Sequence, residues 1–175
     1  LHLSASDHPI GAYAMPFAVQ IHATGGPEAL VYENVAVSDP GPGEVRLRQR
    51  AIGVNYIDVY HRTGLYKLLK LPAIIGSEGA GDVVAIGRGV DRFKVGDRVA
   101  YAGPLGGYAE ERIVPAERLV KLPDGISYET AAAGLLQGMT VRYLLREVYR
   151  VGPETTMLLH AAAGGVGLIA CQWAH

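Results

Sequence analysis

A glycine-rich turn near the C-terminal end constrains the fold of this chain more than any other feature. The turn reads Ala162-Ala-Gly-Gly-Val-Gly, an A-x-G-x-x-G pattern, and it separates an apolar run at 156–161 from an apolar segment that begins at Val166. Small residues in such a turn let the backbone approach a pyrophosphate and let a helix pack closely on a strand. The pattern predicts a buried strand, a tight turn and a helix, which together begin a parallel α/β sheet.

The turn has two interpretations. It can simply pack a helix against a strand, or it can hold a dinucleotide pyrophosphate on the free N–H groups and positive dipole end of that helix. On the second interpretation the cofactor-binding residues are Ala163, Gly164, Gly165, Val166 and Gly167. The acidic residue that contacts the ribose is expected about 20 residues further on, so the sequence does not distinguish NAD from NADP.

Short alternating segments separated by glycine and proline fill the chain from Phe17 to Pro123. They predict strands at 17–22, 44–48, 81–86, 98–102, 108–114 and 119–122. Residues 55–62 favour one short helix between these strands, since Tyr56 and Tyr60 are four residues apart. The pattern indicates a small, mostly β domain.

The composition changes after residue 124. Ser127 is a natural N-cap for an Ala-rich helix at 128–136, and the spacing of apolar residues predicts a second helix at 139–149. We therefore divide the chain into a β domain, residues 15–135, and the start of a dinucleotide-binding domain, residues 136–175. Residues 1–14 lack an initiator methionine and precede Met15, so we interpret them as a tag or translation remnant.

Charge and cysteine content narrow the classes of function. The chain has 16 Lys and Arg against 17 Asp and Glu, which gives a formal net charge of -1. The charged residues are scattered along the sequence without runs, which argues against nucleic acid or an anionic membrane as a partner. The longest apolar stretch, 157–170, is too short to cross a bilayer. Cys171 is the only cysteine, which excludes an intramolecular disulfide and a four-cysteine zinc site. We expect a cytoplasmic protein.

Several sequence blocks are similar to those of the bacterial NADPH:quinone oxidoreductases, the zeta-crystallin relatives in the zinc-free branch of the medium-chain dehydrogenase/reductase superfamily. The blocks are Gly53-Val-Asn-Tyr-Ile-Asp, Arg62-Thr-Gly-Leu-Tyr, Gly76-Ser-Glu-Gly-Ala-Gly, Val95-Gly-Asp-Arg-Val, Leu136-Gln-Gly-Met-Thr and His160-Ala-Ala-Ala-Gly-Gly-Val-Gly. Their order and spacing resemble the family over residues 15–175, which correspond to about the first half of a member.

The resemblance implies an α/β fold with a mostly β N-terminal part. A GroES-like β domain is expected first, followed by the first elements of a Rossmann fold, truncated at the end of this chain. The resemblance also implies NADPH as the cofactor, a quinone as the substrate and a homodimer as the intact assembly.

The same blocks differ from those of the zinc-dependent relatives. Where those enzymes have a catalytic cysteine and a histidine ligand, this chain has Asn55 and Ser77. Asparagine and serine offer neither a thiolate nor an imidazole, so these positions cannot build a tetrahedral catalytic zinc site. We therefore predict no metal.

Candidate site residues follow from the resemblance. An asparagine and nearby tyrosines lie beside the nicotinamide in the family, which implies catalytic roles for Asn55, Tyr60 and Tyr66 and cofactor contacts for the first two. The resemblance adds Gln137 and Thr140 as cofactor-binding residues. Each has a structural alternative: the asparagine can cap a helix, the tyrosines can fill half-buried positions, and a helical threonine often bonds a preceding carbonyl.

Other titratable residues give weaker indications. The histidines show no ligand spacing, Asp58 and Glu78 could pair as carboxylates, and Arg62 could hold a developing negative charge. The family pattern favours a buried structural position for Glu78. We nominate no general acid.

Together these observations predict an NADPH-dependent quinone reductase. An alkenal or enone double-bond reductase of the same superfamily is the nearest alternative enzyme. A non-catalytic crystallin-like or RNA-binding protein, or an inactive fragment, is the alternative from another class. Because the sequence stops at His175 inside an expected helix without a Gly or Pro stop signal, we expect these 175 residues alone to bind cofactor poorly.

Overall fold

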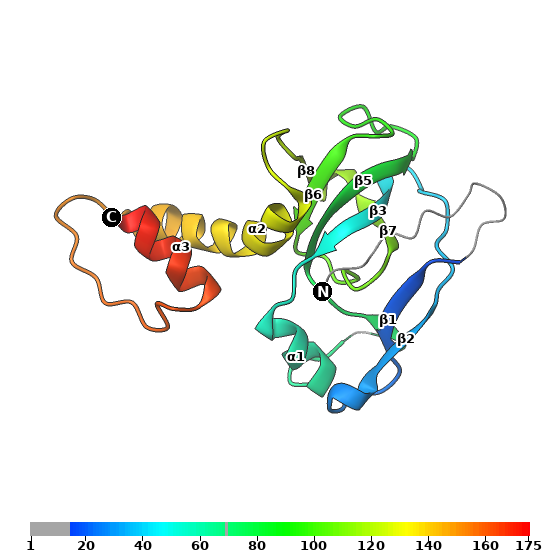
Figure 1. Ribbon diagram of the computed structural model, residues 1–175, viewed down its shortest axis with the longest axis horizontal. Coiled ribbons are helices and arrows are strands. Elements are labelled where there is room, and N and C mark those ends of the chain that lie inside the picture. Colours follow the sequence, from blue (N-terminus) through cyan, green and yellow to red (C-terminus); the bar gives the residue numbers. More distant parts are fainter. Residues whose placement is uncertain (1–14, 69) are drawn as a thin grey trace.

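The computed structural model describes residues 15–68 and 70–175, in which two antiparallel sheets lie beside a long helix that extends away from them (Figure 1). The smaller sheet has the strand order β2-β1-β4, and the larger one has the order β7-β3-β5-β6-β8. The strands are β1 (Phe17–Ile21), β2 (Leu30–Asn34), β3 (Glu44–Ile52), β4 (Ala73–Ile74), β5 (Glu78–Ile86), β6 (Arg98–Ala102), β7 (Glu111–Pro115) and β8 (Leu119–Lys121).

Helices connect and extend these sheets. They are α1 (Tyr56–Thr63), α2 (Tyr128–Arg142), the π-helix η3 (Tyr143–Val148) that continues α2, and α3 (Gly165–Ala174), with short 3-10 helices η1 (Pro27–Ala29) and η2 (Ala116–Arg118). α1 lies near the smaller sheet, whereas α2 leaves the larger sheet and carries α3 alongside it (Figure 1). Within the described residues, no helix combines the length and apolar character needed to cross a membrane.

The core of the larger sheet follows from the two-residue period of its strands. Val45 and Leu47 of β3 are fully buried, whereas Arg46 and Arg48 on the opposite face bind Glu111 of β7 at 2.7 and 2.9 Å. The inward side chains form one cluster, which comprises Val45, Leu47, Val83, Val90, Phe93, Val99, Tyr101, Val114 and Leu119. This cluster fixes the β frame on which the site residues stand.

Most of the expected strands are confirmed, with different bounds. The strand expected at 81–86 begins earlier, at Glu78, because residues 78–81 are buried on both faces and show no alternation. The strand expected at 108–114 begins only at Glu111, after an isolated bridge between Ala18 and Ala109. β2 and the two-residue β4 were not predicted, since short edge strands carry little pattern.

α2 corrects the prediction of two separate helices at 128–136 and 139–149. It runs unbroken from Tyr128 to Arg142 and continues as η3. The predicted cap is confirmed, because Ser127 Oγ accepts from the Thr130 N–H at 3.1 Å. Glycine in a helix costs about 1 kcal/mol, yet α2, which packs on β3, β5, β6 and α3, continues through Gly138. The domain boundary proposed between residues 135 and 136 falls inside α2, and that division stays a prediction.

The buried strand predicted at 156–161 is wrong. These residues adopt no strand conformation, and Leu158 is 84% exposed. A strand needs a neighbour that receives its backbone hydrogen bonds, and no strand of the described residues pairs with this segment. The helix predicted after the turn is confirmed as α3.

Candidate active site

Four segments meet where β3 ends and β5 begins. Asn55 occupies the N-cap position of α1, Glu78 opens β5, Gln137 lies within α2, and Gly165 opens α3. Hydrogen bonds join the first three residues, and the fourth borders Gln137. The structure therefore brings together residues from four of the predicted blocks.

The Glu78 carboxylate lies at the centre of this arrangement and is fully buried, as its predicted structural position requires. Its Oε1 accepts from Asn55 Nδ2 at 2.7 Å and lies 3.5 Å from Gln137 Nε2. Its Oε2 accepts from the Leu136 backbone N–H at 2.9 Å. A buried carboxylate needs such donors to offset its desolvation, so Glu78 holds the end of β3 and the middle of α2 together.

Gln137 links this network to the start of α3. Its Nε2 donates to Asn55 Oδ1 at 3.0 Å, whereas its Oε1 is a buried acceptor without a partner in the described part of the chain. A Cβ added to Gly165 would lie 3.2 Å from Gln137 Cγ. An acceptor oxygen without a partner thus belongs to a side chain next to the predicted dinucleotide turn.

Gly53 makes the close approach of these segments possible. A Cβ at this position would lie 2.3 Å from the Ala132 carbonyl oxygen and 2.4 Å from Glu78 Oε1. The Gly53 N–H also donates to the Glu78 carbonyl oxygen at 3.2 Å. Only a residue without a side chain can pass between β5 and α2 here.

Asp58 holds the first turn of α1 in place. Its Oδ2 accepts from the Asn55 backbone N–H at 2.9 Å and from the Tyr108 hydroxyl at 2.8 Å. Burial above all, and then the hydrogen bond to Asp58, raise the pKa of the Tyr108 phenol well above its usual value. Tyr108 therefore stays protonated at neutral pH and acts as a donor that fixes Asp58.

The predicted catalytic tyrosines form an aromatic cluster on and beside α1. The ring centroids of Tyr60 and Tyr66 are 5.2 Å apart, and Tyr56 packs edge-on against Tyr60 at 5.3 Å. Tyr60 is half-buried, and Tyr66 is 49% exposed. The rings offer an apolar surface on and beside the helix that Asn55 caps, and a phenol hydroxyl can donate to a carbonyl oxygen.

The predicted dinucleotide turn leads directly into α3, with Gly164 at its N-cap. The first N–H groups of an α-helix have no carbonyl partner within the helix. A Cβ at Gly167 would lie 2.4 Å from the Ala161 carbonyl oxygen, so this glycine lets the helix rest against the turn. The turn residues Ala163 to Gly165 are exposed, and their contact with a pyrophosphate stays a prediction.

The contacts of Thr140 and the burial of Ser77 fit structural roles for both residues. Thr140 Oγ1 donates to the Leu136 carbonyl oxygen at 2.8 Å, which is the helical alternative considered for it. Ser77 is buried, with 6% of its surface exposed. Across residues 15–68 and 70–175, no three His, Cys, Asp or Glu side chains are grouped so that they could hold a metal ion.

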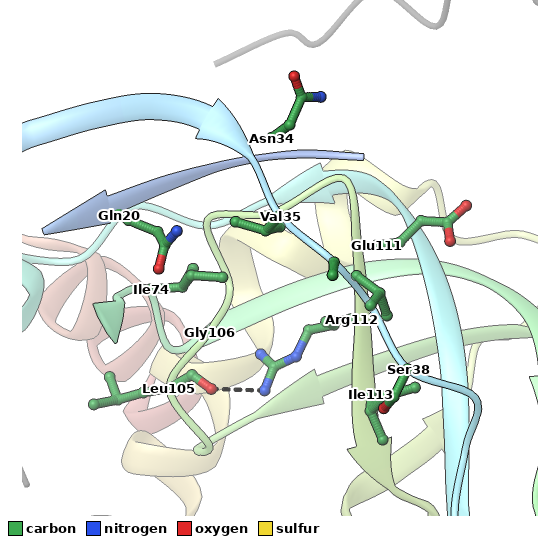
Figure 2. A pocket seen from close by; sticks show the side chains of 12 residues that line it. Gln20, Asn34, Val35, Ser38, Ile74, Leu105, Gly106, Glu111, Arg112 and Ile113 are labelled. Atoms are coloured by element: carbon green, nitrogen blue, oxygen red, sulfur yellow. Dashed lines mark hydrogen bonds between the residues drawn. The ribbon is translucent and has the colours of Figure 1, made fainter. Parts of the chain in front are cut away.

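A hollow of about 550 Å³ lies between the two sheets, and Figure 2 shows its lining. Its walls include Gln20 of β1, Ile74 of β4 and Arg112 of β7, and none of the predicted site residues. Arg112 Nη2 donates to the Leu105 carbonyl oxygen at 2.7 Å and thereby holds the adjoining loop. We therefore do not place the candidate site in this hollow.

Known proteins are similar to this chain in sequence and in fold. Residues 41–124 match the alcohol dehydrogenase GroES-like domain. Over 157 residues, the chain is 59% identical to the quinone oxidoreductase of Pseudomonas aeruginosa, which covers 89% of this chain and 48% of that protein. Over about half the length of that relative, the chain is therefore similar to a quinone oxidoreductase and carries a GroES-like domain match.

A solved structure and a second sequence relative show the same similarity. The Escherichia coli quinone oxidoreductase, solved in complex with NADPH, superposes with a TM-score of 0.88 at 47% identity and covers 90% of this chain and 49% of its own. The 2-haloacrylate reductase of a Burkholderia species is 47% identical over 166 residues, 91% of this chain and 50% of that protein. The chain spans about half the length of the curated relatives it matches, and the predicted fold class is confirmed.

Sequence reasoning missed the partners that fix the site. Glu78 was singled out, but the residues that it joins are 23 and 58 positions away in the chain. Tyr108 was not singled out, since Asp58 lies 50 positions away. One signal was available: a lone carboxylate among the glycines and alanine of Gly76-Ser-Glu-Gly-Ala-Gly indicates a buried charge that needs partners.

Proposed function

We propose that the whole protein containing this chain reduces quinones, with NADPH as the electron donor. Support comes from the quinone oxidoreductases at 47–59% identity, one of them solved with NADPH. In the structure, the proposal rests chiefly on Gln137 Oε1, a buried acceptor next to the start of α3 that has no hydrogen-bond partner among the described residues. A cytoplasmic location and a homodimer are part of the proposal and rest on the family resemblance.

The site residues fit a nicotinamide dinucleotide. A buried acceptor without a partner is costly, and the carboxamide N–H₂ of a nicotinamide would satisfy Gln137 Oε1. The nearby helix start would attract a pyrophosphate through free N–H groups and the dipole of α3. We assign the pyrophosphate contacts to the predicted residues Ala163, Gly164, Gly165, Val166 and Gly167.

The side chains around this position have separate roles. Bound NADPH supplies the hydride of the reaction. Asn55 orients the nicotinamide edge, because Glu78 and Gln137 fix its amide. Tyr60 and Tyr66 exclude water from one wall, and their hydroxyls bind a quinone carbonyl oxygen. Solvent protonates the reduced oxygen, so no side chain is assigned as a general acid.

A second candidate is reduction of a carbon–carbon double bond next to a carbonyl group. It is favoured by the 47% identity to a protein named 2-haloacrylate reductase and by the CurK enoyl reductase structure, with a TM-score of 0.85 at 28% identity. Such a substrate presents the same carbonyl oxygen to the tyrosine hydroxyls. The same residues would therefore serve either reaction.

Steady-state assays of the whole protein with 1,4-benzoquinone and with a 2-alkenal separate the two candidates. We expect the higher kcat/KM with the quinone, and turnover of the alkenal alone would favour the second candidate. Tyr60→Phe should lower kcat/KM about tenfold, the value of one lost hydrogen bond. Tyr32→Phe, at an exposed position on β2, is the matched control and should leave kcat/KM unchanged.

A further inference from the structure

We propose that Glu78 is a positioning residue that fixes the direction of a hydrogen-bond chain running from Glu78 through Asn55 to Gln137. The chain ends on Gln137 Oε1 and so makes the site selective for a nicotinamide that carries a carboxamide N–H₂. This inference rests on the proposed function, because it concerns how the proposed cofactor is recognised.

The direction of the chain follows from the chemistry of its first member. A carboxylate accepts hydrogen bonds and cannot donate them. Glu78 Oε1 therefore faces the amide nitrogen of Asn55, at 2.7 Å, and Asn55 Oδ1 faces the other way. That oxygen requires a donor, which Gln137 Nε2 provides at 3.0 Å. The remaining oxygen, Gln137 Oε1, is left as an acceptor without a partner.

The two amides alone could not fix this direction. Each carries one acceptor and one donor group, so a chain of amides can be reversed by turning every side chain over. In the reversed chain, Gln137 would present its nitrogen instead of its oxygen. The charge of Glu78 removes that alternative, because an amide oxygen turned toward the carboxylate would repel it.

The free end of the chain lies where the proposed cofactor would pass. Gln137 is half-buried and borders Gly165 at the start of α3. The last torsion of a glutamine side chain is broad, so the amide plane can turn to present Oε1 to a ligand. A ligand that donates to this oxygen removes the penalty of an unsatisfied buried acceptor, and a ligand without a donor does not.

Isothermal titration of the whole protein with three probes tests the inference. The probes are NADPH, its reduced 3-acetylpyridine analogue, in which a methyl ketone replaces the carboxamide, and 2′,5′-ADP, which lacks the nicotinamide half. We expect the wild type to bind NADPH about tenfold more tightly than the analogue, the value of one satisfied buried acceptor. Glu78→Gln should bring this ratio close to one and leave the affinity for 2′,5′-ADP unchanged.

Two further variants keep the test decisive. Glu111→Gln alters a largely buried carboxylate that binds Arg46 and Arg48 away from the site, and it should retain the wild-type ratio. Gln137→Met removes the free acceptor itself, so this variant should bind NADPH and the analogue with similar affinity. It provides the test if circular dichroism shows that Glu78→Gln does not fold.

The outcomes separate this inference from the proposed function. A wild-type protein that binds neither NADPH nor 2′,5′-ADP overturns both. A wild type that binds NADPH and the analogue equally overturns only the inference. The inference is also overturned if Glu78→Gln keeps the tenfold preference, or if Glu111→Gln loses it as well.

Discussion

The β region, residues 15–125, and the C-terminal region, residues 143–175, use their apolar side chains differently. In the β region, Val45, Leu47 and Tyr101 are fully buried in one cluster. In the C-terminal region, Leu158 is 84% exposed and Trp173 is 43% exposed. Figure 1 shows the corresponding difference in arrangement, sheets on one side and a loop with α3 on the other.

The difference shows which elements a chain can complete from its own residues. α3 forms in the C-terminal region because a helix satisfies its backbone groups within one segment. Residues 156–161 have an apolar sequence suited to a buried strand, but a strand obtains its hydrogen bonds from a neighbour. Whether an apolar segment is buried therefore depends on the neighbouring elements that cover it as well as on its own residues.

The largest expected effect contrasts one core residue with one exposed residue. Leu47→Ala should lower the free energy of unfolding of the β region by about 2–5 kcal/mol, because it leaves a cavity in the core. Leu158→Ala is the matched control and should change it by less than about 0.5 kcal/mol. Urea denaturation followed by far-UV circular dichroism measures both, and equal effects would abolish the contrast between the regions.

A smaller effect is expected within the C-terminal region. Gly167→Ala places a Cβ 2.4 Å from the Ala161 carbonyl oxygen, so the turn must shift at a cost of about 1–3 kcal/mol. Trp173 is the only tryptophan and lies in α3, so its fluorescence reports this region during denaturation.

Gly134→Ala in α2 is the control for that substitution. A Cβ at Gly134 meets no atom within 4 Å, and alanine should therefore stabilise the helix by about 1 kcal/mol. If both substitutions shift the Trp173 transition in the same direction, the close approach at Gly167 does not govern the stability of α3.

The smallest expected effect is an alkaline loss of stability confined to the β region. Burial is the main cause that raises the pKa values of Tyr101 and Tyr108 in the folded state. Their protonated forms are favoured by folding, so the stability they contribute is complete below about pH 10, the unfolded value, and is lost as the pH rises toward the folded value.

Tyr108→Phe should make that alkaline loss less steep. It should also cost about 1 kcal/mol at neutral pH, since the hydrogen bond to Asp58 is removed. Denaturant midpoints measured by circular dichroism across the alkaline range check this expectation. A variant profile with the wild-type slope would show that the Tyr108 phenol contributes nothing to it.

Local features were the most readily predicted from the sequence. The Ser127 cap, the helix at α1 and the alternating strands of the larger sheet depend on residues only a few positions apart. β5 shows where this reasoning ends, because its first residues are covered on both faces and carry no alternation.

The sequence named members of the candidate site, whose roles stay predictions, but it did not show the hydrogen bonds that connect them. Asn55, Gln137 and the glycine turn were identified from motifs, whereas the Glu78 contacts that join them depend on the packing of β5 against α2. The predicted strand at 156–161 fails for the same reason, since a neighbouring strand is a long-range partner that no local pattern encodes.

Because α2 is continuous, the part of the candidate site around Asn55 and the part at the start of α3 move together. At 1.5 Å per residue, its 15 residues form a rod about 22 Å long, so a tilt of about 5° at Ser127 moves Arg142 by about 2 Å. That displacement exceeds the tolerance of a hydrogen bond. A substitution on the buried face of α2, for example at Ala132, is therefore expected to shift both the contacts of Gln137 with Asn55 and the start of α3, where we propose that the dinucleotide binds.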